Sequence, residues 1–203
     1  MNFDWKSIVR TVAPTETPVT LAEAKAHVRA SEFDDDDAFI TALIDAATAH
    51  VDGYTGILGR ALVTQTWRHD FCEWPADGVL RLPLAPVASI TSVKYSDADN
   101  AEQTVTASGN YALLADARGP FARFTSGFTA PALYDERQDR VRVTYVAGYG
   151  AATAVPAAIK AAMLLMIGHW YRSREAVVVG QTPADLPMGV DALLTPYRRV
   201  WCG

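Results

Sequence analysis

The stretch "DRVRVTYVAGYGAATAVPAAIKAAMLLMIGHWYRSRE", residues 139–175, changes its hydrophobic period half-way and thereby decides the fold class. Between Arg140 and Tyr145 polar and apolar residues alternate, which is the pattern of a half-buried antiparallel strand. Pro156 then suits the first position of a helix. An apolar stripe at helical spacing follows, made of Ile159, Met163, Met166, Ile167 and Trp170 and widened by Leu164, Leu165 and Tyr171. A strand-rich region therefore gives way to a long buried helix at this point.

The region from Arg60 to Tyr145 contains short segments rich in β-branched and aromatic residues, separated by turn signals such as "SDADNAEQ" and "ASGN". These segments are "ALVTQTWRHDF", "GVLRLPL", "VASITSVKYSD", "AEQTVTA", "NYALL", "FARFTS" and "DRVRVTYVAG". Their regular short spacing favours a small antiparallel sandwich or barrel over a parallel sheet with crossover helices.

The N-terminal region predicts two helices. Thr20 lies three residues before Glu23, which is the spacing of a capping box. In "SEFDDDDAFITALIDAATAHVDGYTG", residues 31–56, Asp34 or Asp35 can cap a second helix, and two glycines can end it. Its apolar positions follow helical spacing and are Phe39, Ile40, Leu43, Ile44, Ala47, Val51 and Tyr54.

Together these regions predict an α+β fold. Residues 1–59 form an N-terminal helical part, residues 60–147 an inserted antiparallel β domain, and residues 148–203 the C-terminal helices and tail. Neither helical half carries enough apolar surface to fold alone, so we expect the N- and C-terminal helices to pack together as one unit.

The composition restricts the class of protein. Half of the 203 residues are hydrophobic, a fifth are charged, and the net charge is -5 with a pI near 5.3. Proteins that grip phosphate backbones usually carry a basic surplus, so that class is disfavoured. Two distant cysteines do not make a disulfide framework, the start of the chain lacks an apolar signal core, and "AAMLLMIG" is too short to span a bilayer. We expect a soluble protein that is not exported.

The four consecutive aspartates, Asp34 to Asp37, raise the question of a metal site. Successive residues of a helix point about 100 degrees apart, so the four carboxylates cannot converge on one ion. Carboxylates at a helix N-terminus instead complement the helix dipole. We predict no metal site here, and only about 1 kcal/mol as the cost of replacing Asp36 and Asp37 with asparagine.

Other catalytic and cofactor motifs are incomplete in this sequence. Gly148 and Gly150 follow a strand as in a dinucleotide-binding turn, but Thr153 occupies the third glycine position, so a tight strand-to-helix connection is the better interpretation. The four histidines have no ligand spacing, and no G-x-S-x-G, H-E-x-x-H or C-x-x-C motif occurs. We therefore predict no catalytic residues and no cofactor.

The C-terminal tail has the composition of an interface. Tyr197, Arg198, Arg199 and Trp201 belong to the residue types that dominate protein–protein binding, and a chain end can reach a neighbour. The alternative is that the tail packs on its own domain. The loop at residues 174–189, "REAVVVGQTPADLPMG", is also more apolar than a solvated loop requires, which a neighbouring surface would explain.

The order of these features resembles the head–tail connector, or adaptor, family of tailed bacteriophages, prophages and gene transfer agents. The resemblance rests on five blocks that occur in the right order and cover most of the chain. They are residues 18–56 ("PVTLAEAKAHVRASEFDDDDAFITALIDAATAHVDGYTG"), 61–75 ("ALVTQTWRHDFCEWP"), 80–97 ("LRLPLAPVASITSVKYSD"), 141–177 ("VRVTYVAGYGAATAVPAAIKAAMLLMIGHWYRSREAV") and 186–201 ("LPMGVDALLTPYRRVW").

The resemblance implies a structural protein of the virion or a virion-like particle, made in the bacterial cytoplasm and located at the head–tail junction. Such adaptors form a ring beneath the portal, usually with matching twelvefold symmetry. They extend the DNA channel and give the stopper or tail-terminator protein its attachment platform. The family implies no catalysis, cofactor or membrane partner, and an acidic channel wall would let DNA pass without specific binding.

The resemblance also implies roles for particular residues. The C-terminal segment of such adaptors tends to engage the portal, a role that would fall on Tyr197, Arg198, Arg199 and Trp201. The wide apolar stripe of the third long helix would supply the contacts between copies in the ring, at Met163, Ile167, Trp170 and Tyr171.

Two functions of other classes remain open. One is an enzyme whose site is assembled from residues such as His69, Asp70 and Glu73. The other is a ligand-binding β domain that uses Trp67 and Trp74, for example to hold a sugar. A ring protein should assemble with a portal, an enzyme should lose activity on a single His or Asp substitution, and a binding module should melt at a higher temperature with its ligand.

Overall fold

The computed structural model describes residues 6–32, 34–173 and 188–199. Within these ranges the chain forms two compact units. The first, the β unit, contains residues 6–14 and Thr64–Gly148. The second, the helical unit, contains Thr15–Val63 and residues 149–199. The helical unit is therefore interrupted in sequence by most of the β unit.

Two antiparallel sheets make up the β unit. The larger has five strands in the order β1-β2-β8-β4-β5 and the smaller has three in the order β3-β7-β6. The strands are β1 (Lys6–Val12), β2 (Gln65–Phe71), β3 (Val79–Arg81), β4 (Val87–Ser96), β5 (Glu102–Val105), β6 (Tyr111–Asp116), β7 (Gly119–Phe124) and β8 (Val141–Ala147). Each of the seven segments predicted as strands overlaps one of β2–β8; β6 extends beyond the end of its segment and β7 begins before its segment does.

Alternation along the strands builds the core of the β unit. In β8 the side chains of Val141, Val143 and Tyr145 are buried, while the residues between them are only partly buried. Trp74 joins the two sheets, because its ring contacts Tyr95 of β4 and Phe124 of β7 at centroid distances of 5.5 and 5.6 Å.

Strand β1 corrects the predicted domain boundary. The first residues of the chain were expected in the helical part, but β1 pairs antiparallel with β2, with Ser7 opposite Asp70 and Val9 opposite Arg68. Its partner lies almost sixty residues later in the chain, so no local pattern identifies the pairing. The residues before Thr15 belong to the β unit.

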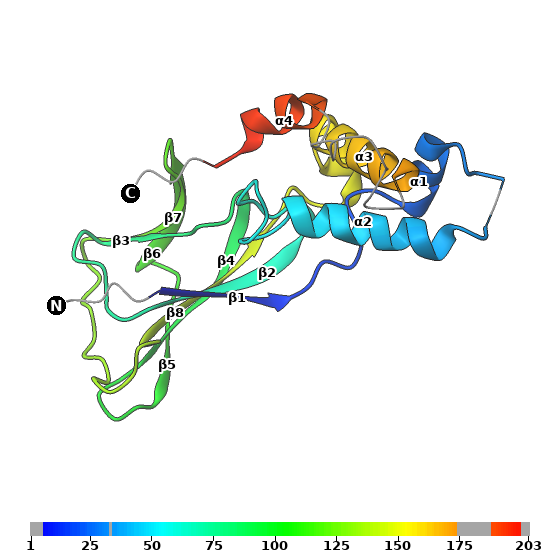
Figure 1. Ribbon diagram of the computed structural model, residues 1–203. Coiled ribbons are helices and arrows are strands. Elements are labelled where there is room, and N and C mark those ends of the chain that lie inside the picture. Colours follow the sequence, from blue (N-terminus) through cyan, green and yellow to red (C-terminus); the bar gives the residue numbers. More distant parts are fainter. Residues whose placement is uncertain (1–5, 33, 174–187, 200–203) are drawn as a thin grey trace, which may run out of the picture. The chain divides into compact units, whose positions relative to one another are not determined.

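The helical unit contains α1 (Leu21–Val28), α2 (Asp37–Val51), α3 (Ala157–Arg172) and α4 (Met188–Leu194), with short 3₁₀ helices η1 (Ala152–Ala154) and η2 (Thr195–Tyr197). Helices α1, α2 and α4 all contact α3 (Figure 1). The expected α+β fold, with N- and C-terminal helices packed together and an antiparallel β insertion, is confirmed. None of the helices in the described ranges is long and apolar enough to span a bilayer.

The ends of the helices agree with the sequence at α1 and differ from it at α2. The predicted capping box is present, since Oγ1 of Thr20 accepts from the N–H of Glu23 at 3.2 Å and Oε2 of Glu23 accepts from the N–H of Thr20 at 2.8 Å. Helix α2 begins after Asp36, so its N-cap lies one or two residues later than the expected Asp35 or Asp34, and the side chain of Asp36 makes no capping bond. It ends at Val51, so Tyr54 lies outside the helix.

Candidate interaction surfaces

The described part of the C-terminal tail lies on its own helical unit. Nε of Arg60 donates to the carbonyl oxygen of Tyr197 at 2.6 Å. The N–H of Arg199 donates to the carbonyl oxygen of Leu58 at 3.1 Å. The guanidinium of Arg198 lies 2.6 Å from the carboxylate of Asp191 and remains 42% exposed. Trp201 lies outside the described residues. The tail residues from Tyr197 to Arg199 are thus held in place by their backbone while Arg198 faces solvent.

The four residues predicted for ring contacts on α3 separate into two pairs. Met163 and Ile167 are fully buried in the helical core, so their side chains cannot touch another chain, and this part of the prediction is corrected. Trp170 and Tyr171 are half-buried at the C-terminal end of α3. The stripe is wide because α3 packs against three helices, and its partly buried apolar side chains are Trp170 and Tyr171 at the C-terminal end and Leu164 and Leu165 in the middle.

The aspartates at the start of α2 hold the helices together. Nζ of Lys25 on α1 lies 2.7 Å from the carboxylate of Asp34 and 2.6 Å from that of Asp37. Hydrogen bonding from Lys25 lowers the pKa of Asp34, and hydrogen bonding to Asp34 raises the pKa of Lys25. Asp36 accepts a 2.5 Å hydrogen bond from the hydroxyl of Tyr171 on α3. These carboxylates therefore join α1, α2 and α3, a role that local sequence patterns do not predict.

No metal or nucleotide site is formed in the described ranges. They contain no group of three His, Cys, Asp or Glu side chains that could hold a metal ion. Gly148 and Gly150 adopt positive φ angles of 125° in the connection from β8, and α3 begins only at Ala157. The glycines lead into the short 3₁₀ helix η1 and not into the N-terminus of α3, so they form a connection and not a dinucleotide-binding turn.

The residues of the enzyme hypothesis do not converge. Nδ1 of His69 lies 3.2 Å from the carbonyl oxygen of Arg81, and its ring contacts that of Phe71 in a tilted arrangement with a centroid distance of 4.1 Å. Asp70 is the next residue of β2 and therefore points to the opposite face of the sheet, where Arg68 binds both of its oxygens. Glu73 is exposed beyond the end of β2. A proton relay through these three side chains is not assembled.

The two tryptophans of the ligand-binding hypothesis are used for packing. Trp67 is buried, with 7% of its surface exposed, and donates from Nε1 to the side-chain oxygen of Gln65 at 3.1 Å. Nε1 of Trp74 donates to the carbonyl oxygen of Pro131, and its ring contacts Phe128 at a centroid distance of 5.2 Å. The two rings therefore do not offer a shared open platform for a sugar.

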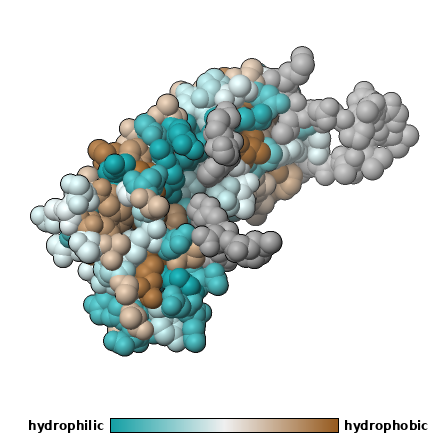
Figure 2. All heavy atoms as spheres, turned by 90° about the vertical axis from the view of Figure 1, so that its left-hand side faces the viewer, coloured by the Kyte–Doolittle hydropathy of each residue, from teal (hydrophilic) through white to brown (hydrophobic). Residues whose placement is uncertain are grey.

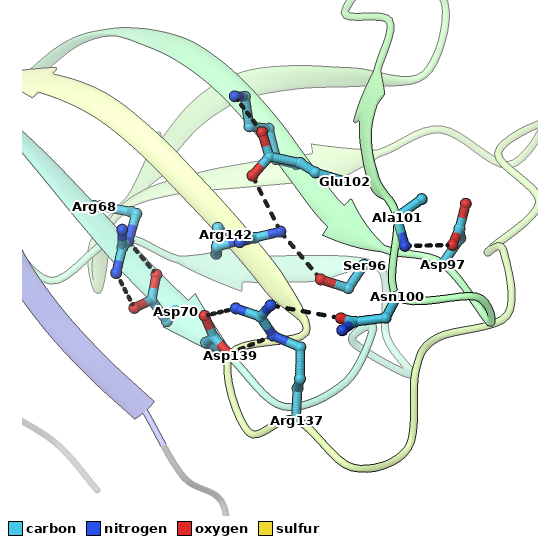
Figure 3. Close-up of polar contacts among 11 residues, drawn as sticks. Arg68, Asp70, Ser96, Asp97, Asn100, Ala101, Glu102, Arg137, Asp139 and Arg142 are labelled. Carbon is cyan, nitrogen blue, oxygen red and sulfur yellow. Dashed lines mark hydrogen bonds and ion pairs between the residues drawn. The ribbon is translucent and has the colours of Figure 1, made fainter.

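A network of arginines and carboxylates covers one end of the five-stranded sheet (Figure 3). Arg68 binds Asp70 and Arg137 binds Asp139, each through two nitrogens, and Arg142 contacts Ser96 at 3.1 Å and Glu102 at 3.3 Å. The hydrogen bond from Arg137 lowers the pKa of Asp139. Because each guanidinium has a carboxylate partner, this positive charge is largely neutralised and attracts a phosphate backbone weakly.

Large exposed hydrophobic side chains are few in the described ranges. On the face shown in Figure 2, apolar residues lie in separate patches between polar ones. The exposed large hydrophobics are Val9, Val12, Tyr54, Ile57 and Leu114. Three of them belong to the β unit and two, Tyr54 and Ile57, to the helical unit.

Comparison with known proteins identifies the family. Residues 19–200 match the head completion protein family. The chain belongs to the head completion protein family. A search of curated proteins gave no match.

Solved structures similar to this head completion protein come from gene transfer agent particles. A chain from the neck of an empty particle, computed with C6 symmetry, has a TM-score of 0.76 and 26% identity over 97% of both chains. A chain from the native virion has a TM-score of 0.76 and 25% sequence identity over 96% of both chains. A chain from the native neck, computed with C12 symmetry, has a TM-score of 0.65 and 23% sequence identity over 95% of this chain and 97% of the other. This third match supports the fold.

The predicted head–tail connector family is therefore confirmed. The head completion protein is a structural component of the head–tail junction of a phage-like particle. Membership of a structural family supports a role without catalysis.

Proposed function

We propose that this head completion protein forms a closed ring beneath the portal, extends the DNA channel and carries the stopper or tail-terminator protein. The observation that carries the proposal is the match with a neck chain of a gene transfer agent over 97% of both chains. Because the similarity extends over the β unit and the helical unit alike, a shared role for the whole chain is the simplest explanation.

The proposed ring is supported by the symmetry of the similar neck and by two half-buried aromatic residues of α3. That neck was computed with C6 symmetry, so its chains are arranged around an axis. A closed ring needs two different complementary surfaces on each copy. Trp170 and Tyr171, half-buried at the end of α3, are our candidates for one of these surfaces.

Charge supports a channel role without tight DNA binding. The chain carries a net charge of -5, and the arginines of the β-unit network are bound by carboxylates of the same chain. Affinity for DNA comes largely from cationic contacts with phosphates, so DNA can pass such a wall without being retained. No catalytic step is part of this proposal.

Reconstitution with the portal tests the proposal. The full-length chain is mixed with purified portal rings from the same particle, and the complex is examined by electron microscopy and native mass measurement. We expect a closed ring of this chain whose copy number matches that of the portal, and release of this ring from the portal when the chain is truncated after Pro196. A chain that stays monomeric and unbound at concentrations that saturate other neck proteins would contradict the proposal.

A further inference from the structure

The loop that follows α2, Gly53–Gly59, displays two apolar side chains in an unusual place. Tyr54 is 48% exposed and Ile57 is 36% exposed. Single exposed hydrophobics are common on protein surfaces and need no explanation, but two within one short loop are candidates for contact with a partner. A loop that served only as a connection would be expected to carry polar residues at these positions.

The backbone of this loop is fixed by hydrogen bonds. The N–H of Gly53 donates to the carbonyl oxygen of Arg60 at 2.7 Å, and the N–H of Ile57 donates to the carbonyl oxygen of His50 at 2.9 Å. The buried carboxylate of Asp52 accepts from the N–H of Leu62 at 2.7 Å. Because the backbone is already ordered, a partner that binds Tyr54 and Ile57 pays little conformational entropy for the loop.

The C-terminal tail lies along the same loop. The N–H of Arg199 donates to the carbonyl oxygen of Leu58, and Nε of Arg60 donates to that of Tyr197. Ile57 is thus the immediate chain neighbour of a residue that binds the tail. All of these residues belong to the helical unit, so their proximity does not depend on the position of the β unit.

The charge of this region is basic, although the whole chain is acidic. Three arginines, Arg60, Arg198 and Arg199, lie in this region with two carboxylates. The exposed carboxylate of Asp191 binds Arg198, and the carboxylate of Asp52 is buried. Arginine and tyrosine are enriched at the energetic centres of protein interfaces. The complementary surface would present carboxylates around apolar side chains.

We infer that Tyr54, Ile57 and the tail residues Tyr197–Arg199 form one docking surface, here called the loop–tail surface, for an acidic and partly apolar segment of the portal protein. The inference rests on the proposed function and extends it, because it assigns portal binding to a rigid loop that neither the tail composition nor the helical pattern indicates. The tail alone would then supply only part of the affinity.

A double variant of the loop tests the inference directly. In Tyr54→Ser/Ile57→Ser the tail is intact, and binding of the full-length protein to purified portal rings is measured by sedimentation or surface-based kinetics. We expect the affinity to fall about tenfold or more, because truncated central hydrophobics dominate such losses. The matched control is Leu114→Ser, an equally exposed position (48%) in the β unit, which should bind as the wild type does.

Two further measurements make the outcomes decisive. Binding of the wild type should weaken as salt rises from about 0.1 M to about 0.5 M, since the screening length shortens and the arginines act through charge. The melting temperature of the double variant should stay close to that of the wild type, because both side chains are exposed.

The design separates failure of the inference from failure of the proposed function. If truncation after Pro196 abolishes portal binding while the double variant binds normally, the inference is overturned and the proposed function stands. If the double variant loses binding to the stopper or tail protein but keeps the portal, the choice of partner is overturned. If the wild type does not bind the portal at all, the proposed function falls as well.

Discussion

Asp37 stabilises the helical unit through a specific partner rather than through the helix dipole alone. Its carboxylate lies 2.6 Å from Nζ of Lys25, whose side chain is 9% exposed. We expect Asp37→Asn to lower the melting temperature, measured by circular dichroism, more than the matched variant Asp35→Asn, because an amide cannot neutralise the ammonium group. Equal melting temperatures would show that the pair contributes nothing. The cost of about 1 kcal/mol predicted from the sequence was for Asp36 and Asp37 together and considered only the helix dipole, so it does not include this ion pair.

Asp116 should make the β unit sensitive to acid. Arg81 donates to both of its oxygens at 2.7 and 2.8 Å, and this hydrogen bonding lowers the pKa of Asp116 from 3.8 to about 2. A carboxyl with a lowered pKa stabilises the fold above its unfolded pKa and loses that effect as pH falls through the folded value. Between pH 3.8 and about 2 the melting temperature should therefore fall more steeply in the wild type than in Asp116→Asn. Parallel curves for the two proteins would contradict this.

Gly56 is required by close backbone packing after α2. A Cβ at this position would meet the carbonyl oxygen of Asp52 and the backbone of Val51, which cannot move aside as a flexible side chain could. We expect Gly56→Ala to destabilise the protein by about 1–3 kcal/mol in urea unfolding. Gly127→Ala is the control, because a Cβ there has no neighbour within 4 Å and its cost should be close to zero. Similar costs for both would show that the loop can relax.

Helix α3 carries both core residues and candidates for ring contacts, and substitutions can distinguish the two groups. Ile167 is fully buried, so Ile167→Ala should destabilise the isolated protein by about 2–5 kcal/mol. Trp170 is half-buried, so Trp170→Ala should cost the isolated protein less and reduce ring formation on the portal more. Urea unfolding and ring occupancy by electron microscopy measure the two effects. A ring that forms normally with Trp170→Ala would remove this residue from the interface.

Helix α3 also illustrates which features of the helices and strands can be predicted from the sequence and which cannot. Hydrophobic period identifies α3, α2 and strands β2–β8, because burial of one face imposes the period locally. Period does not tell which neighbour covers each part of a wide stripe, so it cannot show that Met163 and Ile167 are covered by their own chain. Strand β1 depends on pairing with β2, a long-range contact that leaves only a short local pattern.

For the whole molecule, the order of helical and strand-rich regions was sufficient to predict an inserted β domain, and the resemblance was sufficient to predict the family. The candidate site was less predictable. The tail residues are recognisable by composition, but the loop carrying Tyr54 and Ile57 meets the tail only in the folded chain. Contacts between positions more than 130 residues apart leave no local sequence signal.

The β unit interrupts the helical unit at a single place, and this predicts that it can be removed. The N–H of Tyr149 donates to the carbonyl oxygen of Leu62 at 2.8 Å, so the chain leaves the helical unit and returns to it at neighbouring points. The hydrophobic cluster of the helical unit contains no residue from 64–148. A chain that starts at Thr15 and replaces residues 64–148 with a short glycine–serine linker should therefore fold. Circular dichroism should show a helical protein that unfolds cooperatively in urea, whereas a non-cooperative or aggregated product would mean that the helical unit depends on the β unit.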